Sequence, residues 1–244
     1  MAGNWKMYKT PAETMQFFEK FRPLAATAEH CEIVICPPYT NLAAAVDAAK
    51  GTNIRIGAQN VAWAKEGAFT GETSATMINA VGATHAIVGH SERRQYFGET
   101  DETVLKRTLA ALDSGLTPIV CVGERLEERE SGNTETVLIG QFAKGIAGMS
   151  EQQFAKIIIA YEPVWAIGTG KTATPEIAAE AHRVIRAEVR SRFGKDAADA
   201  VRILYGGSVK PDNVKSLMAQ PEIDGSLVGG ASLDAVSFAG IVNF

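Results

Sequence analysis

Three side chains that could move a proton stand directly after apolar segments of the sequence. Lys6 follows the run 2–5, His90 follows 86–89 and Glu162 follows 157–161. A carboxylate at the end of an apolar strand is partly shielded from water, and this would raise its pKa toward that of a useful base. A neutral imidazole can donate a hydrogen bond to a substrate oxygen, and a lysine can hold a phosphate and polarise a carbonyl. Together they predict proton transfer within a small phosphorylated metabolite, with Glu162 as the base.

Each of these side chains also has an ordinary structural interpretation. Lys6 could be a solvated surface lysine, and His90 a histidine satisfied by its neighbours. Glu162 could form an ion pair with a nearby lysine or arginine. Their position at strand ends favours function, because the active sites of parallel α/β proteins lie at the carboxyl ends of the strands.

Two glycine-rich turns follow the last two apolar runs, at 206–208 and 229–230. Glycine lets backbone N–H groups come close to an anion. Barrel enzymes frequently build a phosphate site from the loops after their last two strands. The two turns together therefore predict a phosphate-binding site.

The segment after Glu162 has the composition of a lid. Pro163 disfavours helical geometry at Glu162, so the strand should extend through this residue. Residues 164–172 combine apolar side chains with two glycines, which suits a segment that closes over a ligand and excludes water. Residues 170–172 also suggest a nucleotide-binding loop, but that pattern requires a glycine where Trp165 stands.

These residues must be held by a fold in which strands and helices alternate. Short β-rich runs that do not alternate with polar residues are typical of parallel strands buried on both faces. We expect strands at 2–5, 33–36, 54–59, 86–89, 118–122, 157–161, 201–205 and 226–228. We expect helices at 11–21, 42–49, 103–112, 136–146, 175–193, 213–219 and 233–242. The alternation favours a closed (β/α)₈ barrel over residues 1–244 as one domain, with an open doubly wound sheet as the alternative.

Composition narrows the class of protein further. Hydrophobic residues make up 46% of the chain, which is enough for a sizeable core, and the net charge of −4 gives no support to nucleic-acid or membrane-surface binding. Cys31, Cys36 and Cys121 give no disulfide framework, and with no leader or membrane-length apolar run they favour the cytoplasm. His30 lies close to the first two cysteines, so a metal site competes with buried structural thiols. The usual ligand spacing is lacking, and we expect no metal.

Four segments together resemble a single enzyme family. They read AGNWKM at 2–7, VGHSERR at 88–94, AYEPVWAIGTGK at 160–171 and YGGSV at 205–209. They run from residue 2 to nearly the end of the chain, in family order and at family spacing. On these motifs the chain resembles the triosephosphate isomerases, which are (β/α)₈ barrels.

The resemblance implies the interconversion of dihydroxyacetone phosphate and D-glyceraldehyde 3-phosphate through an enediolate, a step of glycolysis and gluconeogenesis, without metal or organic cofactor. It implies that Glu162 is the base, His90 a neutral electrophile and Lys6 an electrostatic stabiliser. Asn4 would help to place the substrate. The remaining implied residues are Glu92 beside Lys6, Cys121 packed as a support beside the base, and the phosphate-binding groups Gly168, Ser208, Gly229 and Gly230. Glu92 also fits an ordinary carboxylate at a helix start.

The resemblance further implies a homodimer. Residues 59–72 would insert into the partner near Asn4 and Lys6, and this loop carries Trp63 and Phe69, which make it more apolar than a free surface loop. Family members commonly carry several more residues ahead of the first motif. We therefore expect a short first strand, on which the placement of Lys6 and the stability depend.

Two other functions remain open from the sequence. One is a non-catalytic phosphate-binding protein on the same barrel, and the other is a different phosphosugar enzyme. Lys6, His90 and Glu162 occurring together favour catalysis, because binding alone needs no base at a strand end. The segment around Glu162 disfavours a different phosphosugar enzyme.

Overall fold

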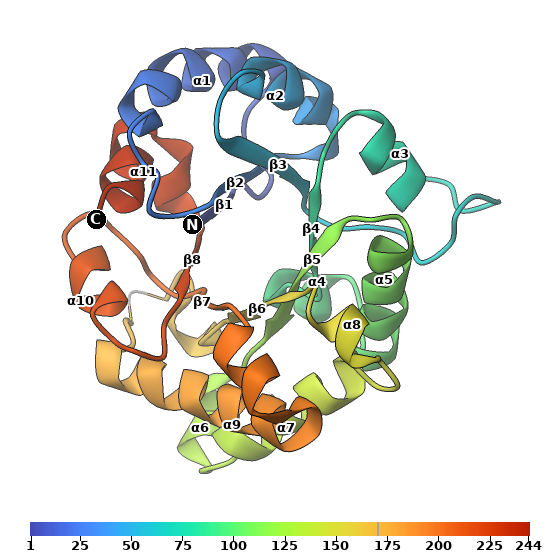
Figure 1. Ribbon diagram of the computed structural model, residues 1–244, viewed down its shortest axis with the longest axis vertical. Coiled ribbons are helices and arrows are strands. Elements are labelled where there is room, and N and C mark those ends of the chain that lie inside the picture. The colour runs from blue at the N-terminus through green and yellow to red at the C-terminus, as the bar shows by residue number, and fades with distance from the viewer. Residues whose placement is uncertain (170) are drawn as a thin grey trace.

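The strands close into a barrel in the computed structural model, which describes residues 1–169 and 171–244 (Figure 1). Within these ranges there are eight strands: β1 (Ala2–Asn4), β2 (Ile33–Cys36), β3 (Ile54–Ala58), β4 (His85–Val88), β5 (Thr117–Val122), β6 (Ile158–Tyr161), β7 (Ile203–Tyr205) and β8 (Gly225–Val228). Each pairs in parallel with the next, and β1 also pairs with β8 through Ala2 opposite Leu227. This last pairing confirms the closed barrel and rules out the open sheet.

Helices surround the strands and connect one to the next (Figure 1). Those described are α1 (Pro11–Ala25), α2 (Leu42–Ala49), α3 (Ala75–Ala80), α4 (Ser91–Tyr96), α5 (Asp101–Asp113), α6 (Leu126–Glu130), α7 (Thr134–Gly145), α8 (Glu151–Phe154), α9 (Pro175–Ala200), α10 (Val214–Met218) and α11 (Ala235–Val242). The seven helices expected from the sequence are all present. The short helices α3, α4, α6 and α8 are additional, because four to six residues are too few to show a helical period.

Two helices, α1 and α9, continue well beyond the residues expected from the sequence. In α1 the helix continues past Phe21 and includes Pro23 near its end. Helix α9 extends to Ala200 because two helices meet at Gly194, whose φ of 86° breaks the regular geometry. None of the helices in the described ranges has the length and apolar character needed to cross a membrane.

The side chains of the strands divide between two apolar layers, because successive residues of a strand point to opposite faces. The layer inside the barrel contains Ala2, Val34, Cys36, Ile87, Ile119, Cys121, Ile158, Ala160, Leu204 and Leu227. Ile33 and Ile35 point the other way, into the larger layer between strands and helices. The barrel interior is therefore filled, and the strand ends are left to form a site.

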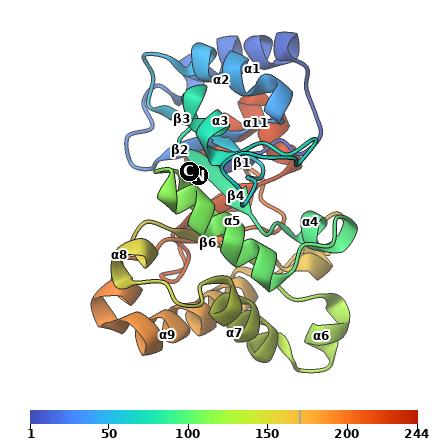
Figure 2. The same ribbon diagram turned by 90° about the vertical axis from the view of Figure 1, so that its right-hand side faces the viewer.

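Figure 2 shows α4 and α6 at one end of the barrel and α8 at the other. Helix α4 follows β4 and α6 follows β5, so their end is the carboxyl end of the strands. Active sites of barrel enzymes lie at that end.

An aromatic cluster anchors the end of β1. Trp5 is fully buried, its indole N–H donates to the carbonyl of Ser232 at 3.0 Å, and its ring meets Phe17 edge-on at 4.8 Å. Phe21 stacks on Phe17 at 5.1 Å and on Phe238 at 5.2 Å. The cluster joins α1 and α11 behind β1, directly beside Lys6.

We predict that Phe21→Ala lowers the free energy of unfolding by about 3–5 kcal/mol, since the cavity left behind loses contacts with two aromatic rings. Urea unfolding followed by circular dichroism measures the change. The control is Phe244→Ala at the half-exposed carboxyl terminus, which should change stability by less than about 1 kcal/mol. Equal losses in the two variants would contradict the role of the cluster.

Candidate active site

A cavity of about 300 Å³ opens at the carboxyl ends of the strands. Its walls include the predicted residues Asn4, Lys6, His90, Glu162, Gly168, Ser208, Gly229 and Gly230. The remaining predicted residue, Glu92, contacts Lys6 at the edge of the site. Residues separated by more than 200 positions in the chain therefore share one cavity, because every strand of the barrel ends there.

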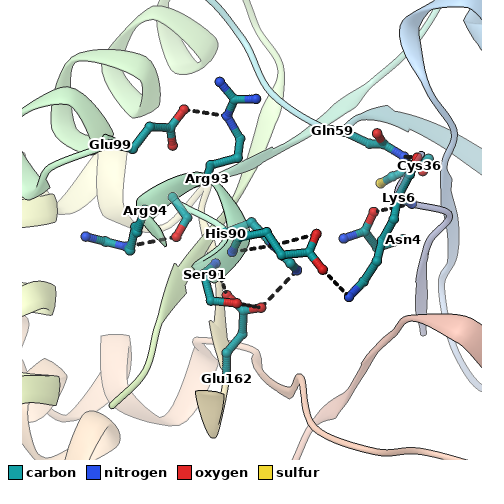
Figure 3. Close-up of polar contacts among 12 residues, drawn as sticks. Asn4, Lys6, Cys36, Gln59, His90, Ser91, Arg93, Arg94, Glu99 and Glu162 are labelled. Atoms are coloured by element: carbon teal, nitrogen blue, oxygen red, sulfur yellow. Dashed lines mark hydrogen bonds and ion pairs between the residues drawn. The ribbon is translucent and has the colours of Figure 1, made fainter. Parts of the chain in front are cut away.

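Glu162 is held at the cavity wall by its neighbours across the barrel (Figure 3). The backbone N–H of Ser91 donates to Oε2 at 2.9 Å, the Ser91 hydroxyl donates to Oε1 at 3.1 Å, and His90 Nε2 lies 2.9 Å from Oε1. The carboxyl group is almost completely buried. Glu162 also donates its backbone N–H to Val122 at 2.8 Å, so the strand geometry continues through it as expected. Its ion-pair partner is a histidine rather than a lysine or arginine.

The contacts of Glu162 overturn one expectation. Burial raises the pKa of the carboxyl group, but the charge and hydrogen bond of His90 and the two hydrogen bonds from Ser91 outweigh it. The pKa of Glu162 therefore lies below its ordinary value, instead of above it as the sequence suggested. Cys121 packs beside this carboxylate as expected, and burial followed by the Glu162 charge raises the pKa of its thiol.

His90 links the base to the start of α4. Its Nδ1 accepts the backbone N–H of Glu92 at 3.2 Å, which leaves Nε2 to carry the proton of the neutral ring. Burial lowers the pKa of His90, while the charge and hydrogen bond of Glu162 raise it above the ordinary value. If Glu162 moved away, burial and the nearby Lys6 would both favour neutral imidazole.

The pair of Glu162 and His90 also makes stability depend on pH. A lowered carboxyl pKa gives stability that is present above the ordinary value of 4.5 and is lost as the pH falls through the folded-state pKa. A raised imidazole pKa gives stability that is present below 6.5 and is lost as the pH rises through the folded-state pKa. The ion pair therefore stabilises the fold most between pH 4.5 and 6.5.

Lys6 adopts a backbone geometry that side-chain-bearing residues rarely take. Its φ is 52°, in the left-handed region, and such strain is found mostly at functional sites. Its backbone N–H donates to Asn4 Oδ1 at 3.0 Å, and its ammonium nitrogen lies 2.5 Å from Glu92 Oε1. The predicted contact between Lys6 and Glu92 is confirmed.

The glycine turns leave room for the base and the lysine. A Cβ on Gly206 would lie 2.9 Å from Glu162 Cγ and 3.0 Å from the carbonyl of Tyr161, so this position excludes larger residues. A Cβ on Gly229 would lie 3.4 Å from Lys6 Cε. Backbone, and not side chains, therefore faces this part of the cavity.

The expected lid begins in a buried polar contact. Glu124 accepts the indole N–H of Trp165 at 2.8 Å through Oε1, and its carbonyl accepts the backbone N–H of Val164 at 3.1 Å. Val164–Ala166 form a short 3₁₀ turn, η2, after Pro163. Of the predicted lid, Gly170 lies outside the described residues.

Ser91 and Glu124 were missed as site residues by sequence reasoning. Ser91 is the first residue of α4, directly after His90, whose ring nitrogen caps that helix. Glu124 comes two residues after β5, so its strand-end position is the signal that could have marked it.

The residues considered as metal ligands, His30, Cys31 and Cys36, do not form a cluster. Among the residues described, no three His, Cys, Asp or Glu side chains group in a way that could hold a metal ion. His30 packs edge-on against Phe244 with ring centroids 4.9 Å apart, whereas Cys36 is buried inside the barrel. The residues that are near in sequence thus face different layers.

We predict that Glu162→Gln lowers the pKa of His90, because the largest influence that raises it is removed while burial and Lys6 remain. Proton NMR titration of the His90 ring in both proteins measures the shift. His182, which is buried on the inner face of α9 outside the barrel wall, serves as the reference and should not move. An unchanged pKa of His90 would contradict the electrostatic coupling.

Comparisons with known proteins agree with this geometry. The family model described as triosephosphate isomerase matches residues 1–244. The triosephosphate isomerase of Solibacter usitatus is 79% identical over the whole chain, which covers 98% of that protein. Those of Citrifermentans bemidjiense and Caldanaerobacter subterraneus are 56% and 53% identical over the whole chain, which covers 97% and 98% of them. This chain therefore belongs to the triosephosphate isomerase family.

Proposed function

We propose that Glu162, His90 and Lys6 carry out the interconversion of dihydroxyacetone phosphate and D-glyceraldehyde 3-phosphate in this chain. The observation that supports these roles is that one cavity joins a buried carboxylate, an imidazole with its proton on Nε2, an ammonium group and two glycine turns. A protein that only bound phosphate would need the turns and the lysine, but no carboxylate paired with an imidazole.

Glu162 must first leave its contacts with Ser91 and His90. In the structure, Glu162 Oε1 lies 2.9 Å from His90 Nε2. A substrate oxygen then replaces this carboxylate as the acceptor of the Nε2 proton. Without His90, the main influence that lowers the pKa of Glu162 is gone, while the influence of burial stays. The same movement leaves His90 without the larger of the two carboxylate charges that raise its pKa, since Glu92 remains. The carboxylate therefore becomes a stronger base as the imidazole becomes neutral.

The proton balance of the reaction needs no redox partner. Glu162 removes a proton from one carbon and the electron pair forms the enediolate, and Glu162 then returns the proton to the neighbouring carbon. His90 donates its Nε2 proton to one oxygen and recovers a proton from the other. The ammonium group of Lys6 offsets the negative charge that develops on these oxygens, and Asn4 helps to place the substrate.

The phosphate of the substrate binds to backbone groups at Gly168, Ser208, Gly229 and Gly230, which line the same cavity. Gly168 belongs to the expected lid, so phosphate binding draws the lid over the substrate. Closure excludes water and protects the enediolate from losing its phosphate.

The direct test supplies dihydroxyacetone phosphate to the purified protein in deuterated water. We expect formation of glyceraldehyde 3-phosphate, with deuterium incorporated at carbon, because the proton on Glu162 exchanges with solvent. Nuclear magnetic resonance follows both products. A folded protein that shows neither turnover nor exchange would contradict the proposed function.

We predict that Glu162→Asp lowers kcat by on the order of 10²-fold or more, because the carboxylate retreats by one methylene from the reacting carbon. Glu180→Asp on the exposed face of α9 is the matched control and should keep the full rate. Steady-state kinetics in both directions measure the effect. An unchanged rate in Glu162→Asp would remove this residue from the mechanism.

We further propose that the chain forms a homodimer through residues 59–72, the loop that extends away from the barrel between β3 and α3 (Figure 1). Large apolar side chains stand exposed on this loop, on the connection after β1 and at the end of α4: Met7, Tyr8, Trp63, Phe69, Tyr96 and Phe97. Met7 is 92% exposed and directly follows Lys6, so a partner that covers it would also enclose the lysine.

The loop is held in shape within one chain. Arg107 donates to the carbonyl of Val61 and to Glu72 Oε2 at 3.0 Å, and its guanidinium lies 4.8 Å from the centre of the Trp63 ring. The loop is thus ordered before it meets a partner, which lowers the entropy cost of association.

We predict that Thr70→Glu lowers activity by dissociating the dimer, because an exposed loop residue becomes a buried charge at the interface. Analytical ultracentrifugation and kcat/KM are measured on the same samples. Thr136→Glu on the exposed face of α7 carries the same charge and should stay dimeric and active. A fully active monomer of Thr70→Glu would contradict the proposal.

The three cysteines are free in the structure, and two of them are buried. Free thiols suit a reducing compartment. We therefore propose that the protein works in the cytoplasm.

A further inference from the structure

The connection from β1 to α1 contains two strained residues. Lys6 has a φ of 52° and Lys9 a φ of 71°, and in the described ranges they are the residues other than glycine with positive φ. Left-handed geometry is unfavourable for a lysine and persists where the surroundings enforce it. Something in this fold therefore holds the two residues in place.

Each of these lysines has its carbonyl oxygen bound by a side-chain amide from a later part of the chain. Gln59 Nε2 donates to the Lys6 carbonyl at 2.7 Å and to the Cys36 carbonyl at 2.9 Å (Figure 3). Asn41 Nδ2 donates to the Lys9 carbonyl at 2.7 Å. Two amides thus bind the two strained lysines, one each.

We propose that Gln59 is a positioning residue that fixes the backbone of Lys6 and thereby directs its ammonium group into the cavity. The inference rests on the role proposed above for Lys6. The Cys36 carbonyl, which also accepts the backbone N–H of Trp5 at 3.1 Å, belongs to β2 and gives Gln59 a rigid reference point. The single amide therefore ties the turn at Lys6 to the end of the neighbouring strand.

The chemistry of the contact selects glutamine. Both N–H groups of one amide nitrogen are used, one for each carbonyl. Asparagine is shorter by one methylene, and an ionised glutamate has no proton to donate and would set its charge against two carbonyl oxygens. Methionine matches the length and volume of glutamine without forming either hydrogen bond.

The position of Gln59 also connects two parts of the proposed site. It directly follows β3 and is the first residue of the 59–72 loop. A displacement of this loop would pull on the amide that holds Lys6. The inference therefore gives a physical route by which the interface loop influences the cavity.

The test compares Gln59→Met with the wild-type protein. We expect kcat/KM to fall by on the order of 10-fold or more, because a misdirected ammonium group no longer meets the developing charge. The matched control is Asn41→Leu, which frees Lys9 in the same connection. It should lower the thermal midpoint by a similar amount and keep kcat/KM within about twofold of wild type.

The variant Gln59→Glu adds a pH dependence that would be absent if Gln59 only supported the fold. When the introduced carboxyl is protonated, its O–H can donate one of the two lost hydrogen bonds. The loss of kcat/KM in Gln59→Glu relative to wild type should therefore shrink as the pH falls. The loss of kcat/KM in Gln59→Met relative to wild type should stay constant with pH. If Gln59→Met does not fold, the pH trend of Gln59→Glu decides alone.

Three results with the Gln59 and Asn41 variants would overturn the inference: full activity in folded Gln59→Met, an equal loss of activity in Asn41→Leu, or a loss of kcat/KM in Gln59→Glu that does not change with pH. Lys6→Met separates this inference from the role of Lys6 itself. A loss of activity in Lys6→Met alongside full activity in Gln59→Met defeats only the positioning role. Full activity in Lys6→Met defeats the role of Lys6 and the inference with it.

Discussion

A carboxylate buried at the carboxyl end of β6 is the constraint on which the rest of the site depends. A buried charge is tolerated only when it is paired and hydrogen-bonded, and Glu162 finds both in His90 and Ser91. His90 and Ser91 follow β4 and Glu162 follows β6, so β5 lies between the two strands that carry the base and its partners. Gly123, directly after β5, lets the backbone of Glu162 lie close to it, because a Cβ there would lie 1.8 Å from the carbonyl oxygen of Glu162. A larger residue at 123 would therefore displace the backbone that carries the base.

Much of the fold could be predicted because its signals are local. The strand at 33–36 agrees with β2, and Thr10 caps α1 ahead of Pro11 as its sequence suggests. The barrel then brings strand-end residues together whatever their separation, which is why Lys6, His90 and Glu162 could be grouped from sequence. The short helices could not be predicted, since they are fixed by caps and packing and not by an apolar period.

The contacts of the site were harder to predict than its members. Ser91 and Glu162 are separated by 71 positions, Glu124 and Trp165 by 41, and Gln59 and Lys6 by 53. Whether a carboxylate turns toward an imidazole or toward the cavity depends on one side-chain rotation, and that rotation reverses the direction of its pKa shift. Burial alone, which the sequence does reveal, therefore gave the wrong direction for Glu162.

The base and the lid are joined by the chain itself. Pro163 is the one residue between Glu162 and Val164, and Val164 binds the carbonyl of Glu124 at 3.1 Å while Trp165 binds its side chain. Any motion that releases these contacts also moves the backbone next to Glu162. Because proline has a nearly fixed φ, little of that motion can be absorbed between them. In the proposed mechanism, closing the lid and freeing the carboxylate from Ser91 and His90 are thus coupled mechanically. Because His90 and Ser91 lower the pKa of Glu162, the mechanism we propose makes the base reactive when the lid has shut out water.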